Sequence, residues 1–179
     1  MPKYVAFLRA INVGGHTVKM DYLRRLFEAM GFSNVETFIA SGNVIFDSTS
    51  QSTQALERKI EDALQGALGY QVTTFIRTTS ELVDIARYKP YKDADPEAEG
   101  NTVYIAFVAE TPGDEAQRKL LSFTSAVDEF HVDGCQVYWL CRKKMSESEF
   151  SGALLEKTLG MQATLRNSTT VKRIASKYS

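Results

Sequence analysis

Short apolar runs alternate along the first half of the chain with stretches in which apolar residues recur every three to four positions. The first pattern is typical of strands and the second of helices that bury one face. In chain order we expect a strand at 4–11, a helix over 23–30, strands at 35–40 and 44–46, a helix over 56–67 and a strand at 72–76. The predicted order is therefore β, α, β, β, α, β.

The second half of the chain repeats this order. The expected elements are a strand at 102–108, a helix over 115–123, strands at 129–132 and 136–140, a helix over 149–159 and a strand at 162–165. Residues 89–100 contain two prolines among several charged residues and are typical of a linker. We expect a first βαββαβ half with an extra helix over 1–88, a linker over 89–100, and a second half with a C-terminal helix over 101–179.

Residue matches support a duplication. Residues 69–73 match 160–164, and residues 77–80 match 166–169, at the same place in the two element orders. The βαββαβ order is that of the ferredoxin-like fold. The runs at 4–11 and 102–108 are apolar on both faces, so both faces of each sheet should be buried. The sequence predicts an α+β protein of tandem duplicated ferredoxin-like halves that pack as one unit.

Composition narrows the classes of partner. The 21 basic and 22 acidic residues give a formal net charge of −1, which provides no reason to expect nucleic acid or anionic lipid. The N-terminal residues lack the apolar run of a signal peptide or membrane helix, so we expect a cytoplasmic protein without a membrane partner. RNA-binding domains that share the βαββαβ order carry a basic and aromatic motif on their third strand. Residues 41–46 lack that motif.

The cysteines and histidines indicate no metal. Cys135 and Cys141 lie on one predicted strand, where they would be roughly 20 Å apart, so we expect reduced thiols. His16 and His131 lie in different halves, and no spacing resembles a zinc site. We therefore expect neither a metal nor another cofactor.

Polar residues near the first strand suggest a place for an anion. Gly14 and Gly15 lie between a strand and a helix, with Lys19 nearby, so their amides and the ammonium group could hold a phosphate. A tight connection that needs a positive φ explains the glycines equally well. Arg9 lies within the apolar strand and needs a structural partner or a ligand. Asn12 could orient a ligand or cap the turn.

Two further features have both a functional and a structural interpretation. Ser41 in Ser41-Gly42-Asn43 could be a nucleophile, but no general base is obviously paired with it, and a hairpin turn explains it better. The last helix carries Lys172, Arg173 and Lys177, which form either a solvated face or a local anion patch. The scattered acidic residues nominate no acid–base pair, so catalytic residues stay unknown.

Three segments resemble the bacterial family called domain of unknown function 1697. They are Phe7-Leu8-Arg9-Ala10-Ile11-Asn12-Val13-Gly14-Gly15, Ser41-Gly42-Asn43-Val44-Ile45-Phe46 and Arg166-Asn167-Ser168-Thr169-Thr170-Val171-Lys172-Arg173-Ile174. Ala10 stands where many relatives have glycine, and Ser168 where an aromatic residue is common. The resemblance implies a duplicated ferredoxin-like architecture and implies no reaction.

The resemblance also selects the polar residues that belong to the family signature. They are Arg9, Asn12, Ser41, Asn43, Arg166, Asn167 and Thr170. Our leading hypothesis is a module that binds an anionic small molecule through these residues, Lys19 and the amides of Gly14 and Gly15. The alternatives are an enzyme acting on a phosphorylated or carboxylated metabolite, and a structural or oligomerisation protein. The oligomeric state is not predicted.

Overall fold

The chain is an α+β protein with two four-stranded antiparallel sheets and, in the described residues, six helices. The structure is a computed structural model that describes residues 1–11, 17–38, 42–91, 98–143 and 147–178. Its elements up to the middle of the chain are β1 (Lys3–Leu8), α1 (Met20–Ala29), β2 (Ser33–Thr37), β3 (Asn43–Asp47), α2 (Thr53–Leu68), β4 (Thr74–Thr78) and α3 (Thr79–Arg87). The remaining elements are β5 (Thr102–Val108), α4 (Asp114–Leu121), β6 (Asp128–Asp133), β7 (Gln136–Cys141), α5 (Gly152–Leu159), β8 (Ala163–Asn167) and α6 (Ser168–Tyr178).

Two compact units contain these elements. Unit 1 comprises Met1–Leu82 with Tyr178, and unit 2 comprises Val83–Lys177, so the division falls inside α3 and ahead of the expected boundary at 88. The sheet of unit 1 has the strand order β2-β3-β1-β4, and the sheet of unit 2 has the order β6-β7-β5-β8. The strands and helices follow one another in the order β, α, β, β, α, β in each half, so the element order predicted from the sequence is confirmed.

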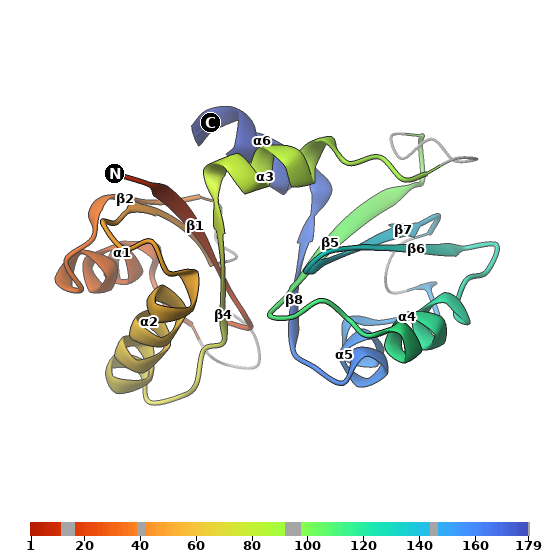
Figure 1. Cartoon of the computed structure of the whole chain (residues 1–179), viewed down its shortest axis with the longest axis horizontal. Helices are drawn as coiled ribbons and strands as arrows, with labels where there is room; N and C mark the ends of the chain where they lie inside the picture. Colours follow the sequence, from red (N-terminus) through yellow and green to blue (C-terminus); the bar gives the residue numbers. More distant parts are fainter. Residues whose placement is uncertain (12–16, 39–41, 92–97, 144–146, 179) are drawn as a thin grey trace. The chain divides into compact units, whose positions relative to one another are not determined.

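Each sheet is covered on one face by two helices of its own unit. In unit 1, α1 and α2 lie on the same side of the sheet, and in unit 2, α4 and α5 do so (Figure 1). Among the apolar residues of these helices, Leu23, Phe27 and Ile60 are fully buried in the core of unit 1. Burial of such side chains supplies about 1.5–3 kcal/mol each, which makes these two layers the main source of stability.

The opposite faces of the sheets are buried as well, as the doubly apolar strands predict. In β1 the alternate residues Val5 and Phe7 are fully buried, although they point away from the face that carries Ala6 and Leu8. In β5 the same holds for Ile105 and Phe107, which lie opposite Ala106 and Val108. A sheet with both faces buried has no open aromatic platform for stacking nucleic acid bases.

Helices α2 and α5 begin and end in the same way. The hydroxyl groups of Ser52 and Ser151 accept hydrogen bonds from backbone amides three residues later, each at 3.2 Å. Gly69 and Gly160 follow the last turns in the left-handed conformation. Ser151 explains why α5 starts at Gly152 rather than at the expected residue 149, since a serine that caps a helix cannot lie inside it.

Carboxyl groups of these helices cover the outer edges of the sheets. Thr74 and Ile76 of the edge strand β4 donate their backbone N–H groups to Glu61 and Glu57 of α2, at 3.1 and 3.3 Å. In unit 2, Ala163 of the edge strand β8 donates to Glu156 of α5 at 2.9 Å. Desolvation raises the pKa of both Glu57 and Glu61. These bonds satisfy amides that an edge strand otherwise leaves open.

Strand β1 ends at Leu8, earlier than the apolar run to Ile11 suggests. Ala10 adopts a left-handed conformation with φ of 56°, which turns the chain out of the sheet. Arg9 is therefore not inside a strand, as expected from the sequence, but in the turn after it, where its backbone N–H donates to the carbonyl of Thr73 at 2.9 Å. An apolar run does not reveal such a turn, because Ala10 carries no turn signature.

We expect Ala10→Gly to raise the free energy of unfolding by about 0.5–1 kcal/mol. A left-handed alanine costs about 1–2 kcal/mol, and glycine removes that strain at some cost in backbone entropy. The exposed Ala67 in the last turn of α2 is a matched control, because glycine at an exposed helical position costs about 1 kcal/mol. Urea unfolding of both variants checks the prediction, and equal losses at the two positions would contradict it.

Candidate functional site

The structure describes six of the ten residues expected to form a site. Asn12, Gly14, Gly15 and Ser41 lie outside the described residues. Of the six, unit 1 contains Arg9, Lys19 and Asn43, and unit 2 contains Arg166, Asn167 and Thr170. The convergence of Arg9 and Arg166 on one site stays a prediction.

The described candidate residues of unit 1 differ in burial and in hydrogen bonding. Asn43 is fully buried at the start of β3, and its side-chain amide donates to the carbonyl of Phe38 at 2.9 Å. The backbone of Phe38 in turn donates to the carbonyl of Asn43 at 3.0 Å, so Asn43 holds the hairpin together. Lys19 precedes α1 with an exposed side chain. Arg9 is half-buried in the turn after β1.

Arg166 is a buried arginine with neutral acceptors. Its side chain is 7% exposed, and its guanidinium donates to the hydroxyl of Thr164 at 2.7 Å and to the carbonyl of Leu165 at 3.0 Å. Burial lowers its pKa to about 10. Arg77 has the same place in β4: it is also 7% exposed, and it donates to the carbonyl of the preceding Ile76 at 2.8 Å. Each arginine thus donates to groups of its own strand.

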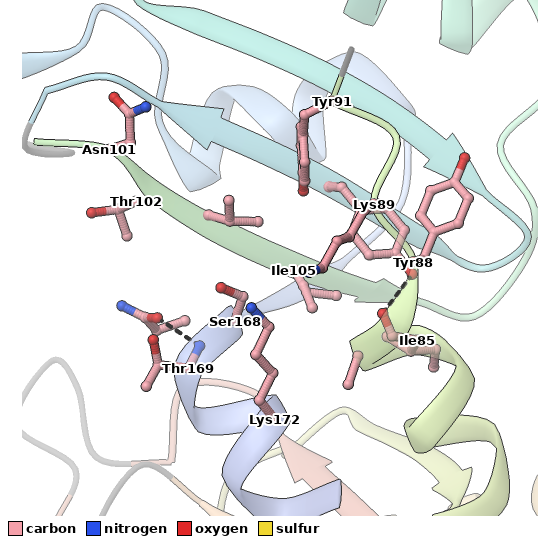
Figure 2. A pocket seen from close by; sticks show the side chains of 14 residues that line it. Ile85, Tyr88, Lys89, Tyr91, Asn101, Thr102, Ile105, Ser168, Thr169 and Lys172 are labelled. Atoms are coloured by element: carbon pink, nitrogen blue, oxygen red, sulfur yellow. Dashed lines mark hydrogen bonds between the residues drawn. The ribbon is translucent and has the colours of Figure 1, made fainter. Parts of the chain in front are cut away.

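A cavity of about 400 Å³ in unit 2 brings a different set of polar residues together (Figure 2). Ligand sites have volumes of roughly 300–1,000 Å³, so a small molecule fits. The cavity lies between the sheet, the segment at the end of α3 and the first turn of α6. Its described lining residues are Ile85, Ala86, Tyr88, Lys89, Tyr91, Asn101, Thr102, Val103, Ile105, Tyr138, Asn167, Ser168, Thr169 and Lys172. Asn167 is the one member of the expected set among them.

Hydrogen-bond donors from separate segments point into this cavity. Figure 2 shows the ammonium groups of Lys89 and Lys172 and the hydroxyl groups of Ser168 and Tyr91 directed toward the same space. Lys89 has no ion-pair partner among the described residues. Asn167 lies at the start of α6, where its side-chain oxygen accepts a hydrogen bond from the backbone of Thr169 at 2.9 Å.

The hydroxyl group of Tyr91 is buried and has no hydrogen-bond partner among the described residues. Desolvation, with the nearby charge of Glu129, raises the pKa of Tyr91 far above its usual range, so the phenol stays protonated. The ring stands edge-on against His131 with centroids 5.4 Å apart, and His131 hydrogen-bonds Glu129, which pairs with Arg142 at 3.2 Å. Tyr91 is therefore a fixed donor that can supply a proton to a hydrogen bond but cannot act as a base.

An aromatic and apolar wall forms the other side of the cavity. The rings of Tyr88 and Tyr138 lie 4.8 Å apart between centroids, and the hydroxyl of Tyr138 donates to the carbonyl of Ile85 at 3.4 Å. Ile105 of β5 lies beside them on the floor of the cavity. The hydrogen bond from Tyr138 fixes the position of its ring in this wall.

Sequence reasoning missed most of this site. Lys89 and Tyr91 fall in the segment that its prolines and charges marked as a linker, and only their mixture of cations and aromatics hinted at binding. Lys172 belongs to the basic residues of the last helix, for which a local anion patch was one of two interpretations.

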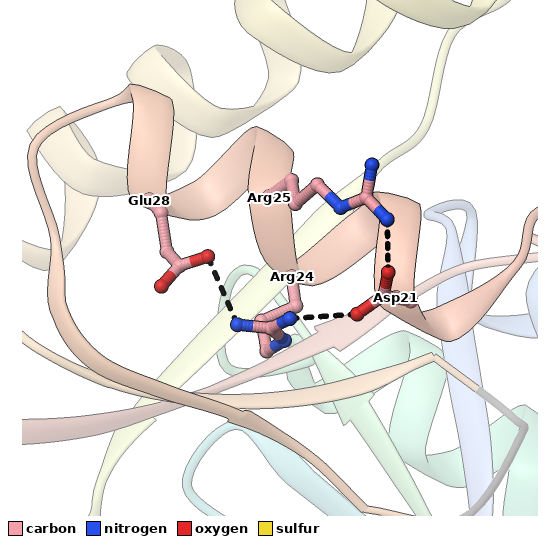
Figure 3. Close-up of polar contacts among 4 residues, drawn as sticks. All are labelled: Asp21, Arg24, Arg25 and Glu28. Atoms are coloured by element: carbon pink, nitrogen blue, oxygen red, sulfur yellow. Dashed lines mark hydrogen bonds and ion pairs between the residues drawn. The ribbon is translucent and has the colours of Figure 1, made fainter.

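The charged cluster on α1 is not a comparable site. Asp21, Arg24, Arg25 and Glu28 form ion pairs with one another on the exposed face of one helix (Figure 3). Arg24 pairs with Asp21 at 2.6 Å and with Glu28 at 3.1 Å. Hydrogen bonds from Arg24 and Arg25 lower the pKa of Asp21. Because these charges neutralise one another, the cluster supports the helix and offers little to a ligand.

A second cavity of about 430 Å³ in unit 2 lies beside the buried Asp128. The carboxyl group of Asp128 already accepts hydrogen bonds from Trp139 Nε1 at 2.8 Å and from the hydroxyl of Ser148 at 2.7 Å. The carboxyl group of Asp128 is thus engaged in holding the fold. Within the described parts of the chain, no group of three or more His, Cys, Asp and Glu side chains is arranged to hold a metal ion.

Comparisons with known proteins agree with the sequence resemblance. Residues 1–138 match the family model described as Protein of unknown function (DUF1697), so the chain belongs to this family and the expectation is confirmed. The C-terminal signature at 166–174 lies beyond the matched residues. A comparison with curated proteins finds no match. None of the described helices has both the length and the apolar character needed to cross a membrane.

One solved structure with a similar fold comes from a bacterium. It is described as the structure of the conserved bacterial protein SP0830 from Streptococcus pneumoniae. The two chains are 22% identical with a TM-score of 0.72, over 99% of this chain and 98% of that chain. At this level of identity the likeness shows the fold and leaves the ligand open.

Proposed function

We propose that this protein binds an anionic small molecule in the 400 Å³ cavity of unit 2 and carries out no chemistry on it. The observation that carries the proposal is the convergence of two ammonium groups and two hydroxyl groups from separate segments on one cavity. Lys89 and Lys172 supply the positive charge, and Tyr91 and Ser168 supply neutral donors.

The charge of the lining supports an anion rather than a cation or a neutral compound. No described lining residue carries a carboxyl group, whereas two carry ammonium groups. Inside a cavity the local dielectric is lower than in water, and hydrogen bonds from ammonium groups to an anion are about twice as strong as neutral ones. The protein as a whole has a net charge of −1, so this positive lining is a local feature.

The chemistry of the lining supports binding without catalysis. General acid–base catalysis needs a group that gains and loses a proton near neutral pH. Tyr91 is held in its protonated form by burial and by the charge of Glu129. An enzymatic role would need a base within reach of the cavity, and the hydroxyl of Tyr91 does not supply one.

Removing either lysine should weaken anion binding by about ten- to a hundredfold, because a hydrogen bond to a charged group contributes about 1.5–3 kcal/mol. Isothermal titration calorimetry with inorganic phosphate at low salt measures the dissociation constants of wild type, Lys89→Ala and Lys172→Ala. Lys157→Ala on the exposed side of α5 is the matched control, since it removes one positive charge from the same unit away from the cavity. Equal affinities in all four proteins, or no binding by wild type, would refute the proposal.

We also propose that the chain is a tandem duplication of a ferredoxin-like unit. Several features support it: the equal strand orders of the two sheets, the serine and glycine caps of α2 and α5, and the matched Arg77 and Arg166.

A further inference from the structure

We propose that the anionic ligand carries an aromatic ring, so that the site takes an aryl phosphate or aryl carboxylate. The inference rests on the proposed function and specifies the chemistry of its ligand. It follows from the separation of polar and aromatic groups inside one cavity, which matches a ligand with a charged end and a flat apolar body.

Several of the polar groups gather on one side of the cavity. Asn101 and Thr102 lie at the start of β5, and the first turn of α6 with Ser168 lies beside them (Figure 2). The ammonium of Lys172 points toward the same side. An anionic group placed there meets hydroxyl and ammonium donors together.

The aromatic groups gather on the other side. Tyr138 is 1% exposed and fixed by its bond to Ile85, whereas Tyr88, which also lines the cavity, is 37% exposed. An exposed tyrosine that leans on a buried one leaves part of its ring open to a ligand. Ile105 extends this wall along the floor. Aromatic rings prefer offset or edge contacts with one another, so an aryl group gains more here than an alkyl group of equal size.

Tyr91 links the two sides. Its hydroxyl is buried without a partner among the described residues, and it points into the cavity between the polar side and the tyrosine wall. A buried donor without an acceptor is unfavourable, and a ligand oxygen near the junction of ring and anionic group would satisfy it. Because His131 holds the ring of Tyr91 edge-on, the position of this donor is fixed.

Three phosphates of graded chemistry test the inference: phenyl phosphate, cyclohexyl phosphate and inorganic phosphate. Calorimetry with wild type should give phenyl phosphate the lowest dissociation constant, about two- to tenfold below that of cyclohexyl phosphate. Tyr88→Leu should remove most of that difference. Tyr22→Leu is the control, because Tyr22 is an exposed tyrosine of α1 in unit 1. Benzoate tests whether the site also takes an aryl carboxylate.

The outcomes separate the inference from the proposed function. If inorganic phosphate binds in a lysine-dependent way and the phenyl group adds nothing over cyclohexyl, the aromatic inference is wrong and the anion site stands. If none of the phosphates or benzoate binds, the proposed function fails and the inference fails with it. Preference for phenyl phosphate that Tyr88→Leu abolishes and Tyr22→Leu preserves supports both.

Discussion

Gly42→Ala is expected to lower the free energy of unfolding by about 3 kcal/mol, from a left-handed strain of about 1–2 kcal/mol and overpacking of about 1–3 kcal/mol. Gly42 has a φ of 81°, and its carbonyl accepts the backbone N–H of Leu8 at 2.9 Å. A Cβ atom at this position would lie 2.6 Å from Cγ2 of Ile11 and 3.2 Å from Cβ of Leu8. Both neighbours are 1% exposed, so they have little room to move.

Gly69→Ala separates the two contributions. Gly69 has almost the same backbone conformation, with a φ of 82°, but a Cβ atom there would meet nothing within 4 Å. This control should lose only the strain of about 1 kcal/mol. Chemical denaturation of the two variants measures the difference. If both variants lose the same free energy of unfolding, the close approach of Leu8 and Ile11 to Gly42 does not contribute to the cost of Gly42→Ala.

Asp128→Ala is expected to cost about 3 kcal/mol, because it leaves two buried or half-buried donors, Trp139 Nε1 and the hydroxyl of Ser148, without their acceptor. Asp128 is 4% exposed and Trp139 is 1% exposed, so water does not readily replace the lost carboxyl group. Trp139 is the single tryptophan of the chain, and its fluorescence follows unfolding directly.

A double-mutant cycle isolates the bond between Asp128 and Trp139. Trp139→Phe keeps an aromatic ring among Tyr104, Phe130 and Phe150 and removes the indole N–H. The double variant should be less destabilised than the sum of the single variants, by about 1 kcal/mol or more, because both single changes break the same bond. Circular dichroism follows unfolding in the variants that lack tryptophan. Strict additivity would mean that the bond contributes nothing.

The element order could be predicted from the sequence because it depends on short-range patterns. Each strand shows its apolar residues within a few positions, and the apolar residues of α2 recur at helical spacing up to Gly69. The residues at which the helices and strands begin and end were harder to predict. The turn at Ala10 depends on a backbone conformation that alanine rarely adopts, so the apolar run to Ile11 concealed it.

The site could not be predicted in the same way, because it depends on tertiary structure. Lys89 and Lys172 are far apart in the chain, and only the packing of α6 and the segment after α3 on the sheet brings them to one cavity. The family resemblance directed attention to Arg9 and Arg166 instead. Of these, Arg166 is buried and donates to Thr164 and Leu165, and its contribution to a ligand site stays a prediction.

The carboxyl groups that cover β4 and β8 determine where this protein can associate through strand pairing. Thr74, Ile76 and Ala163 already donate their outward N–H groups to side chains of the same unit. A strand from another molecule would have to displace these glutamates before it could pair there, so each sheet has one protected edge. The opposite edges are the strands β2 and β6. We therefore expect a strand from another molecule to pair with β2 or β6, and aggregation through strand pairing to begin there.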